Sequence, residues 1–172
     1  MDKVSGSSSI FSVGVKVENG SPITRQLTNN SDLDAVKVTV TVPVLQILES
    51  DGDITGSSLS FDIQLQYNGG GFTTVHSDTI RGRTGDAYNR EYRIKLTGAH
   101  PVDVRLVKTS ANSTDRNFRD LIWQSYSELE DDTNTYPDCA YTRLRLDSEF
   151  FSRIPRRTFR VRGVKVRIPG AG

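Results

Sequence analysis

The chain has 172 residues, which is enough for one domain with a substantial core or for one domain and part of a second. Its net charge is only +1, yet residues 1–132 carry 13 Lys and Arg against 18 Asp and Glu, whereas residues 133–172 carry 9 against 3. This change of sign predicts a boundary between structural units near residue 132.

Several classes of site are excluded by composition. A single cysteine, Cys139, excludes an internal disulfide framework, and we expect it to be an inert buried thiol. Two histidines, His76 and His100, are too few for a cluster with zinc-ligand spacing. No window approaches the roughly 18 apolar residues of a membrane span, and the N-terminus lacks the apolar core of a signal peptide, so we expect a soluble chain.

The N-terminal half predicts strands. Residues 1–9 are polar and small, and we expect a flexible lead-in there. From Phe11 to Val17 apolar residues alternate with polar or small ones, which predicts a strand with one wet face, followed by a turn at residues 19–22. Valines occupy every second position of residues 36–42, and their β-branching favours a strand over a helix.

The acidic loop at residues 49–56 allows two interpretations. Its carboxylates gather near Gly52, as in a calcium loop, but the regular Asp spacing and the closing glutamate of an EF-hand are missing. An ordinary Asp-Gly turn is therefore favoured.

Alternation resumes at residues 61–67 and ends at Asn68 and three glycines, which is a hairpin signal leading into residues 72–75. The glycines lack the Walker pattern and a strand-to-helix context, so a turn is favoured over a phosphate loop. The connection at residues 81–85 is basic, but Asp78 and Asp86 flank it, which favours solvent exposure over contact with nucleic acid or acidic lipid.

Two further strands are predicted at residues 92–96 and 102–106, on either side of a turn at residues 98–101 that places His100 at the surface. Residues 118–129 remain ambiguous. Phe118, Leu121, Ile122, Ser125 and Leu129 fit one face of a helix, whereas Leu121, Trp123 and Leu129 fit one face of a strand.

The C-terminal segment alternates apolar and basic residues at residues 142–146 and again at residues 159–162, which predicts two half-buried strands. The second changes phase at Gly163, where a bulge would restore one continuous apolar face.

Short alternating strands separated by frequent turns are typical of an antiparallel β-sandwich. We therefore predict an all-β fold, with residues 10–132 forming the sandwich and residues 133–172 an additional C-terminal β segment. The predicted core is Val38, Val40, Phe61, Ile63, Leu65, Ile94, Val104 and Trp123. Neither an acid–base pair of carboxylates, a Gly-x-Ser-x-Gly elbow nor a Cys–His nucleophile pair is recognisable, so we predict a protein without catalytic activity or cofactor.

Several motifs occur in the same order as in the tail-tip host-specificity (tip attachment, J) proteins of lambda-like siphophages. They are GSPITR from Gly20, LIWQSYSE from Leu121, FSRIP from Phe151 and RGVKVRIP from Arg162. The chain thus resembles an internal piece of that family over nearly its whole length.

The resemblance implies a fibronectin-III-like or immunoglobulin-like sandwich in which residues 118–129 are a late strand with Trp123 in or near its core. It also implies that residues 133–172 belong to an adjoining tail-tip domain. The full-length protein would be a trimer at the distal tail tip of the virion, with other tail-tip proteins and a bacterial outer-membrane receptor as partners. No small-molecule substrate is implied.

A basic cluster without any acid between its members is the candidate interaction surface: Arg153, Arg156, Arg157, Arg160, Arg162, Lys165 and Arg167. An interface with the acidic sandwich or with an adjoining tail protein is favoured over nucleic acid. A nucleic-acid-binding module and an extracellular fibronectin-III-like adhesion module are the alternative functions.

Overall fold

The computed structural model describes residues 5–131, which lie in the first of the two units into which the chain divides, Met1–Asn134. The strands predicted at residues 142–146 and 159–162, the bulge at Gly163 and the thiol of Cys139 lie outside the described residues. Every regular element between residues 5 and 131 is a strand, which confirms the predicted all-β fold.

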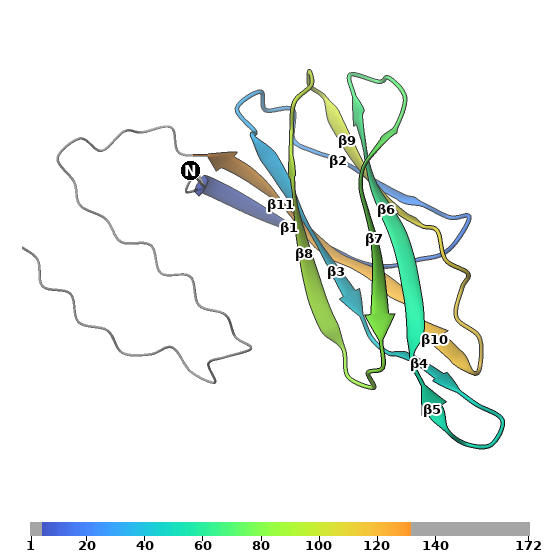
Figure 1. The fold of residues 1–172 in the computed structure, drawn as a ribbon. Helices are drawn as coiled ribbons and strands as arrows, with labels where there is room; N and C mark the ends of the chain where they lie inside the picture. Colours follow the sequence, from blue (N-terminus) through green and yellow to red (C-terminus); the bar gives the residue numbers. More distant parts are fainter. Residues whose placement is uncertain (1–4, 132–172) are drawn as a thin grey trace, which may run out of the picture. The chain divides into compact units, whose positions relative to one another are not determined.

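The strands build two main layers. In chain order they are β1 (Ser5–Val17), β2 (Ile23–Gln26), β3 (Ala35–Val42), β4 (Leu45–Leu48), β5 (Ile54–Thr55), β6 (Ser57–Tyr67), β7 (Thr73–Gly82), β8 (Tyr88–Lys95), β9 (Val102–Lys108), β10 (Asn117–Arg119) and β11 (Leu121–Asp131). One antiparallel sheet has the order β1-β11-β3-β8 and the other β2-β9-β6-β7 (Figure 1). A small sheet, β10-β4-β5, lies beside the end of β6 and β7 (Figure 1).

The core forms between the two layers because each central strand turns every second side chain inward. Val36, Val38, Val40 and Val42 of β3 are fully buried. Phe61 of β6 meets Tyr92 of β8 edge-on, with ring centroids 5.5 Å apart, so the two sheets are in contact. All eight residues of the predicted core are buried, from 0% exposure for Val38 to 8% for Ile94.

The β6–β7 hairpin turns where the sequence predicts it. Asn68 and Gly69 both have positive φ angles, 47° and 69°, and the N–H of Gly70 donates to the carbonyl of Tyr67 at 2.9 Å. Two central residues with positive φ form the turn whose twist matches the flanking strands, and Asn-Gly is the pair that adopts it most easily.

Of the ambiguous residues 118–129, Leu121 to Leu129 lie in the late strand β11, as the family resemblance implies, whereas Phe118 and Arg119 belong to β10 in the small sheet. Leu121 and Trp123 are fully buried, and the register of β11 on β3 shifts between Trp123 and Ser125. This bulge moves Tyr126 to a buried position, so apolar side chains are three residues apart at that point. The irregular spacing explains why the sequence also fits one face of a helix.

The flexible lead-in predicted for residues 1–9 is wrong for Ser5–Ser9, which belong to β1. Ser9 lies opposite Glu128 and Ser8 opposite Leu129 in the β1–β11 ladder. Backbone N–H and C=O groups form such a ladder without any apolar side chain, so a sequence pattern based on side chains does not reveal it.

The first and last strands of the sandwich are neighbours. β11 lies between β1 and β3, and Ser5 is opposite Asp131 in the register. In an immunoglobulin sandwich the last strand forms an edge of the sheet that contains the third and sixth main strands. Here the last strand, β11, lies in the other sheet, and the edge position beside β9 is occupied by β2. Residues 5 and 131 therefore lie at the same end of the sandwich (Figure 1).

Candidate interaction surfaces

The basic cluster predicted as an interaction surface, Arg153 to Arg167, lies outside the described residues. Residues 5–131 present five surface regions with distinct contacts. They are an edge where the two sheets are linked, an end where β11 leaves the sandwich, the edge strand β1, the outer face of the second sheet and a polar hollow beside the small sheet.

The edge strands β7 and β8 are joined across the two sheets by Asp78. The phenol of Tyr92 donates to Asp78 Oδ2 at 2.5 Å, and Arg90 Nη1 lies 3.1 Å from the same oxygen. Burial opposes ionisation of the Asp78 carboxyl, but hydrogen bonds from Tyr92 and the Thr79 N–H, together with Arg90, hold its pKa below the ordinary value. Burial and then the bond to Asp78 raise the pKa of Tyr92. These three residues close the open side of the sandwich.

The end at which β11 leaves the sandwich is fixed by its own carboxylates. Glu128, only 4% exposed, accepts from the backbone N–H of Thr28 at 2.7 Å and from the Thr28 hydroxyl at 2.5 Å. Glu130 accepts from the side-chain amide of Asn30 at 2.6 Å. These bonds hold the β2–β3 connection against β11.

Asp131, the last described residue, has partners on two sides. Its carboxylate receives both hydrogen bonds from Arg93 Nη2, at 2.7 and 2.9 Å, and its backbone N–H donates to Asp34 Oδ2 at 2.8 Å. The direction of the backbone at residue 131 is therefore set by β8 and by the segment before β3.

The free side of β1 is an exposed sheet edge. Gly14 has a φ of +63° at a register shift between Ser12 and Val15, and such a bulge interrupts the row of unpaired backbone groups. Ile10 remains 71% exposed, while Phe11 stacks on Tyr126 with ring centroids 5.0 Å apart. An exposed edge that carries an apolar side chain can accept a strand or an apolar surface from a partner.

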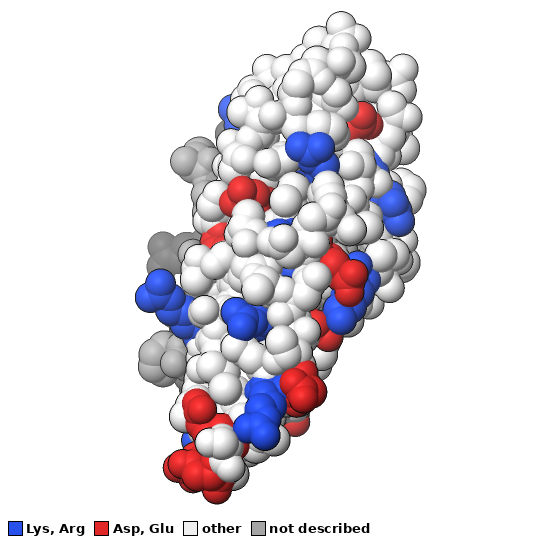
Figure 2. Space-filling view, turned by 90° about the vertical axis from the view of Figure 1, so that its right-hand side faces the viewer, with Lys and Arg blue, Asp and Glu red and all other residues white. Residues whose placement is uncertain are grey.

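The outer face of the second sheet presents mostly neutral polar groups. Gln64 of β6 accepts from Arg105 Nε and Nη2 at 2.8 and 2.6 Å, and the Arg105 guanidinium lies 3.7 Å from the centroid of the Phe72 ring. Figure 2 shows few charged side chains over the upper part of this side and acidic ones gathered at the lower end. The β4–β5 hairpin, at the lower end of Figure 1, carries Glu49, Asp51 and Asp53.

The loop of that hairpin, weighed as a calcium loop from sequence, has the geometry of a turn. The Glu49 N–H donates to the carbonyl of Asp53 at 2.8 Å, and Gly52 has a φ of +93°. Asp51 Oδ1 accepts from the Asp53 N–H, and Glu49 Oε1 accepts from the Thr55 hydroxyl. The carboxylates of Glu49 and Asp51 thus accept hydrogen bonds within the hairpin. Within residues 5–131 no group of three or more possible metal ligands is present.

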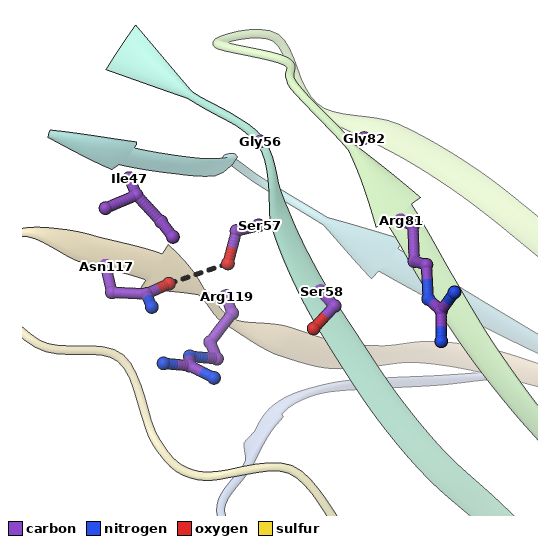
Figure 3. A pocket seen from close by; sticks show the side chains of 8 residues that line it. All are labelled: Ile47, Gly56, Ser57, Ser58, Arg81, Gly82, Asn117 and Arg119. Atoms are coloured by element: carbon purple, nitrogen blue, oxygen red, sulfur yellow. Dashed lines mark hydrogen bonds between the residues drawn. The ribbon is translucent and has the colours of Figure 1, made fainter. Parts of the chain in front are cut away.

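A polar hollow of about 460 Å³ lies where β4 and β10 meet β6 and β7. It is lined by Ile47, Gly56, Ser57, Ser58, Arg81, Gly82, Asn117 and Arg119. Figure 3 shows the Ser57 hydroxyl donating to the side-chain Oδ1 of Asn117, at 2.6 Å, with Arg119 beside them and Arg81 beyond Ser58. The lining holds two cations and no carboxylate.

A buried lysine lies near Arg119. Lys108 at the end of β9 is 1% exposed, and its ammonium has no hydrogen-bond partner within the described part of the chain. Burial lowers the pKa of Lys108, opposed by the attraction of Asp120 and reinforced by repulsion from Lys16 and Arg119. Asp120 forms an ion pair with Lys16 at 3.1 Å and accepts from the Ser113 hydroxyl at 2.5 Å.

Sequence reasoning missed the hollow because its residues come from four strands. Residues 81–85 were interpreted as a solvent-exposed connection, and Arg81 is indeed exposed, but β10 and β4 were not predicted. Through the pairing of β10 with β4, Arg119 comes to line the same hollow as Arg81.

No described helix is long and apolar enough to span a membrane.

Comparison with known proteins identifies the family. The model of the FNIII-A domain of tip attachment protein J matches residues 7–132. The chain is 34% identical over 164 residues to the tip attachment protein J of Escherichia phage SECphi4, covering 92% of this chain and 14% of that protein. It is 29% identical over 143 residues to the tip attachment protein J of Escherichia phage SECphi27, covering 81% of this chain and 12% of that protein.

Among solved structures, the PBSX exported protein XepA aligns with a TM-score of 0.44 and 12% identity, over 86% of this chain and 45% of that chain. The chain spans less than a sixth of the length of either phage relative. With a family model that covers most of its length and a relative above 30% identity, the chain belongs to the tip attachment protein J family, with residues 7–132 as its FNIII-A domain.

Proposed function

We propose that this chain is a structural and adhesive module of a phage tail-tip host-specificity protein, which contributes to tail-tip assembly and to attachment at the host cell surface. The observation that carries the proposal is the FNIII-A match over residues 7–132 together with 34% identity to a tip attachment protein J. The proposal assigns the chain no catalytic step.

The packing of residues 5–131 supports a scaffold role. A continuous apolar core joins the two sheets, and Asp78 links their edges on one side. At the other side Glu128 and Glu130 fix the connection that flanks the end of β11. A scaffold held at both its edge and its end can present its loops in fixed positions.

Partners and location follow from the same family membership. We propose that the full-length protein assembles with copies of itself, as a trimer, and with other tail-tip proteins, and that it meets a receptor in the bacterial outer membrane. The location is the distal tip of the virion tail. The boundary near residue 132 and the adjoining unit of residues 133–172, with its basic cluster, are part of this proposal.

The test is immunogold electron microscopy of virions with antibodies raised against the 172-residue chain. We expect labelling at the distal tail tip and slower adsorption of labelled virions to host cells. Antibodies preincubated with an excess of the chain are the control and should restore adsorption. Label on the capsid or along the tail tube, with unchanged adsorption, would contradict the proposal.

A further inference from the structure

The polar hollow beside the small sheet is lined by two guanidinium groups for which residues 5–131 supply no hydrogen-bond or ion-pair partner. Among the arginines of residues 5–131, five use their side chains in hydrogen bonds or ion pairs: Arg25, Arg83, Arg90, Arg93 and Arg105. Of the remaining arginines in this range, Arg81 and Arg119 both line the hollow and Arg116 does not. The Nε of Arg119 is buried without a hydrogen-bond partner in the described chain.

Of the carboxylates closest in sequence to the lining arginines, Asp120 and Asp78 are engaged elsewhere, while Glu49, Asp51 and Asp53 lie on the neighbouring β4–β5 hairpin and do not line the hollow. Asp120 follows Arg119 in sequence but pairs with Lys16 and Ser113. Asp78, on the same strand as Arg81, pairs with Arg90 and Tyr92. Lys108 adds positive potential near Arg119. The lining itself therefore carries two guanidinium groups and no carboxylate, and guanidinium groups match the planar geometry of a carboxylate or phosphate.

The size of the hollow and the neutral polar groups in its lining indicate that the ligand is larger than a simple ion. A volume of about 460 Å³ is in the range of small-molecule sites, of which one oxyanion fills only a part. Since Ser57 donates to Oδ1 of Asn117, the side-chain Nδ2 hydrogens of Asn117 remain as donors, and the hydroxyl of exposed Ser58 adds a donor and an acceptor. Apart from Ile47 the lining side chains are polar, which disfavours an apolar ligand.

We propose that this hollow binds an anionic saccharide, that is, a sugar bearing a carboxylate or a phosphate. Arg119 and Arg81 bind the anionic group, while Ser58 and Asn117 bind sugar hydroxyls. The site is a property of the isolated chain and goes beyond the proposed structural role, since it is measured in solution whether or not the chain acts at a tail tip.

The experiment is a titration of the ¹⁵N-labelled 172-residue chain followed by NMR, with glucuronate and glucose 6-phosphate as probes. We expect saturable shifts at the amides of Gly56 and Gly82, which line the hollow. Glucose alone should shift them far less because it lacks the anion, and inorganic phosphate should bind about tenfold more weakly than glucose 6-phosphate. Tighter binding of glucuronate would indicate a sugar that bears a carboxylate, and tighter binding of glucose 6-phosphate a sugar that bears a phosphate.

Three variants sharpen the test. Arg119→Gln and Arg81→Gln should each weaken binding by about tenfold or more, because each removes a charge-assisted hydrogen-bonding group. Gly82→Leu should block the hollow, since a Cβ at Gly82 meets nothing within 4 Å and the side chain can extend without displacing backbone. Arg116→Gln is the matched control, an exposed arginine three residues before Arg119 that lies outside the lining.

Arg81 is exposed at the end of β7, so Arg81→Gln keeps the test valid even where another variant unfolds. Three results would overturn the proposal. They are equal shifts with glucose and with its phosphate, equal affinity for phosphate and glucose 6-phosphate, and unchanged binding in folded Arg81→Gln and Gly82→Leu.

Discussion

The end of β11 and the polar hollow differ in whether their charged side chains have partners. Where β11 ends, the carboxylates of Glu128, Glu130 and Asp131 all have donors within the chain. At the hollow, the guanidinium groups of Arg81 and Arg119 have no partner in residues 5–131. Paired polar groups fix geometry, whereas unpaired ones beside a hollow are available to a ligand. The difference separates a region that holds the chain from a region that can bind a ligand.

The core of the sandwich provides the largest test. Trp123→Ala should lower the free energy of unfolding by about 3–5 kcal/mol, because Trp123 is fully buried and its loss leaves a cavity. Urea denaturation measures the change. Val75→Ala on the edge strand β7, where Val75 is 41% exposed, should cost under about 0.5 kcal/mol. Similar losses in the two variants would show that β11 is not a core strand.

The carboxylate end can be broken at one residue. Glu128→Ala should lower the free energy of unfolding by about 1–3 kcal/mol, because it leaves the Thr28 N–H and hydroxyl without their acceptor. Faster hydrogen exchange at the Thr28 amide should accompany the loss. Glu91→Ala is the control, since its exposed pair with Lys37 contributes about 0–1 kcal/mol. Equal effects would refute the anchoring role of Glu128.

The buried ammonium near the hollow should be a stability cost. Lys108→Met should raise the free energy of unfolding by about 1 kcal/mol, because it keeps the packing of a long side chain and removes an unpaired buried charge. Thermal unfolding followed by circular dichroism measures the gain. Lys108→Arg retains the charge and should give none, and a loss of stability in Lys108→Met would show that the ammonium is satisfied.

The smallest effect concerns pH at the β7–β8 edge. In the folded protein the pKa of Asp78 lies below its unfolded value of about 3.9. The ionised carboxylate therefore contributes fully to the free energy of unfolding above about pH 3.9, and this contribution is lost as the pH falls through the folded pKa. Asp78→Asn should reduce the loss of unfolding free energy at acid pH by less than about 1 kcal/mol, since the site is partly exposed. Asp86→Asn, in the next connection, should leave it unchanged.

Tyr92 gives the opposite sign at alkaline pH. Its folded pKa is raised, so its contribution is present below about pH 10, the pKa of a free phenol, and is lost as the pH rises further. Tyr92→Phe should make the free energy of unfolding fall less steeply with rising pH in the alkaline range. An unchanged slope in that variant would contradict the proposed link between the sheets.

Side-chain alternation was enough to predict the central strands, because Val36 to Val42 and Phe61 to Leu65 bury one face each. It failed where that signal is short or interrupted. β4 and β5 contain only four and two residues, and the bulge after Trp123 breaks the period in β11. The hollow could not be predicted, since Arg81 and Arg119 come to line it together only through the placement of β10, and nothing local in the sequence specifies that placement.

The adjacency of β1 and β11 has a mechanical consequence. Ser5 and Asp131 are opposite each other in an antiparallel ladder, so a force that separates these two residues acts along the interstrand hydrogen bonds and perpendicular to the strands. The pairs are then loaded one after another, starting from Ser5 and Asp131, instead of all together as in shear. Tension applied at residues 5 and 131 would therefore peel β1 from β11 at low force and lengthen the chain while the valine-rich core stays closed.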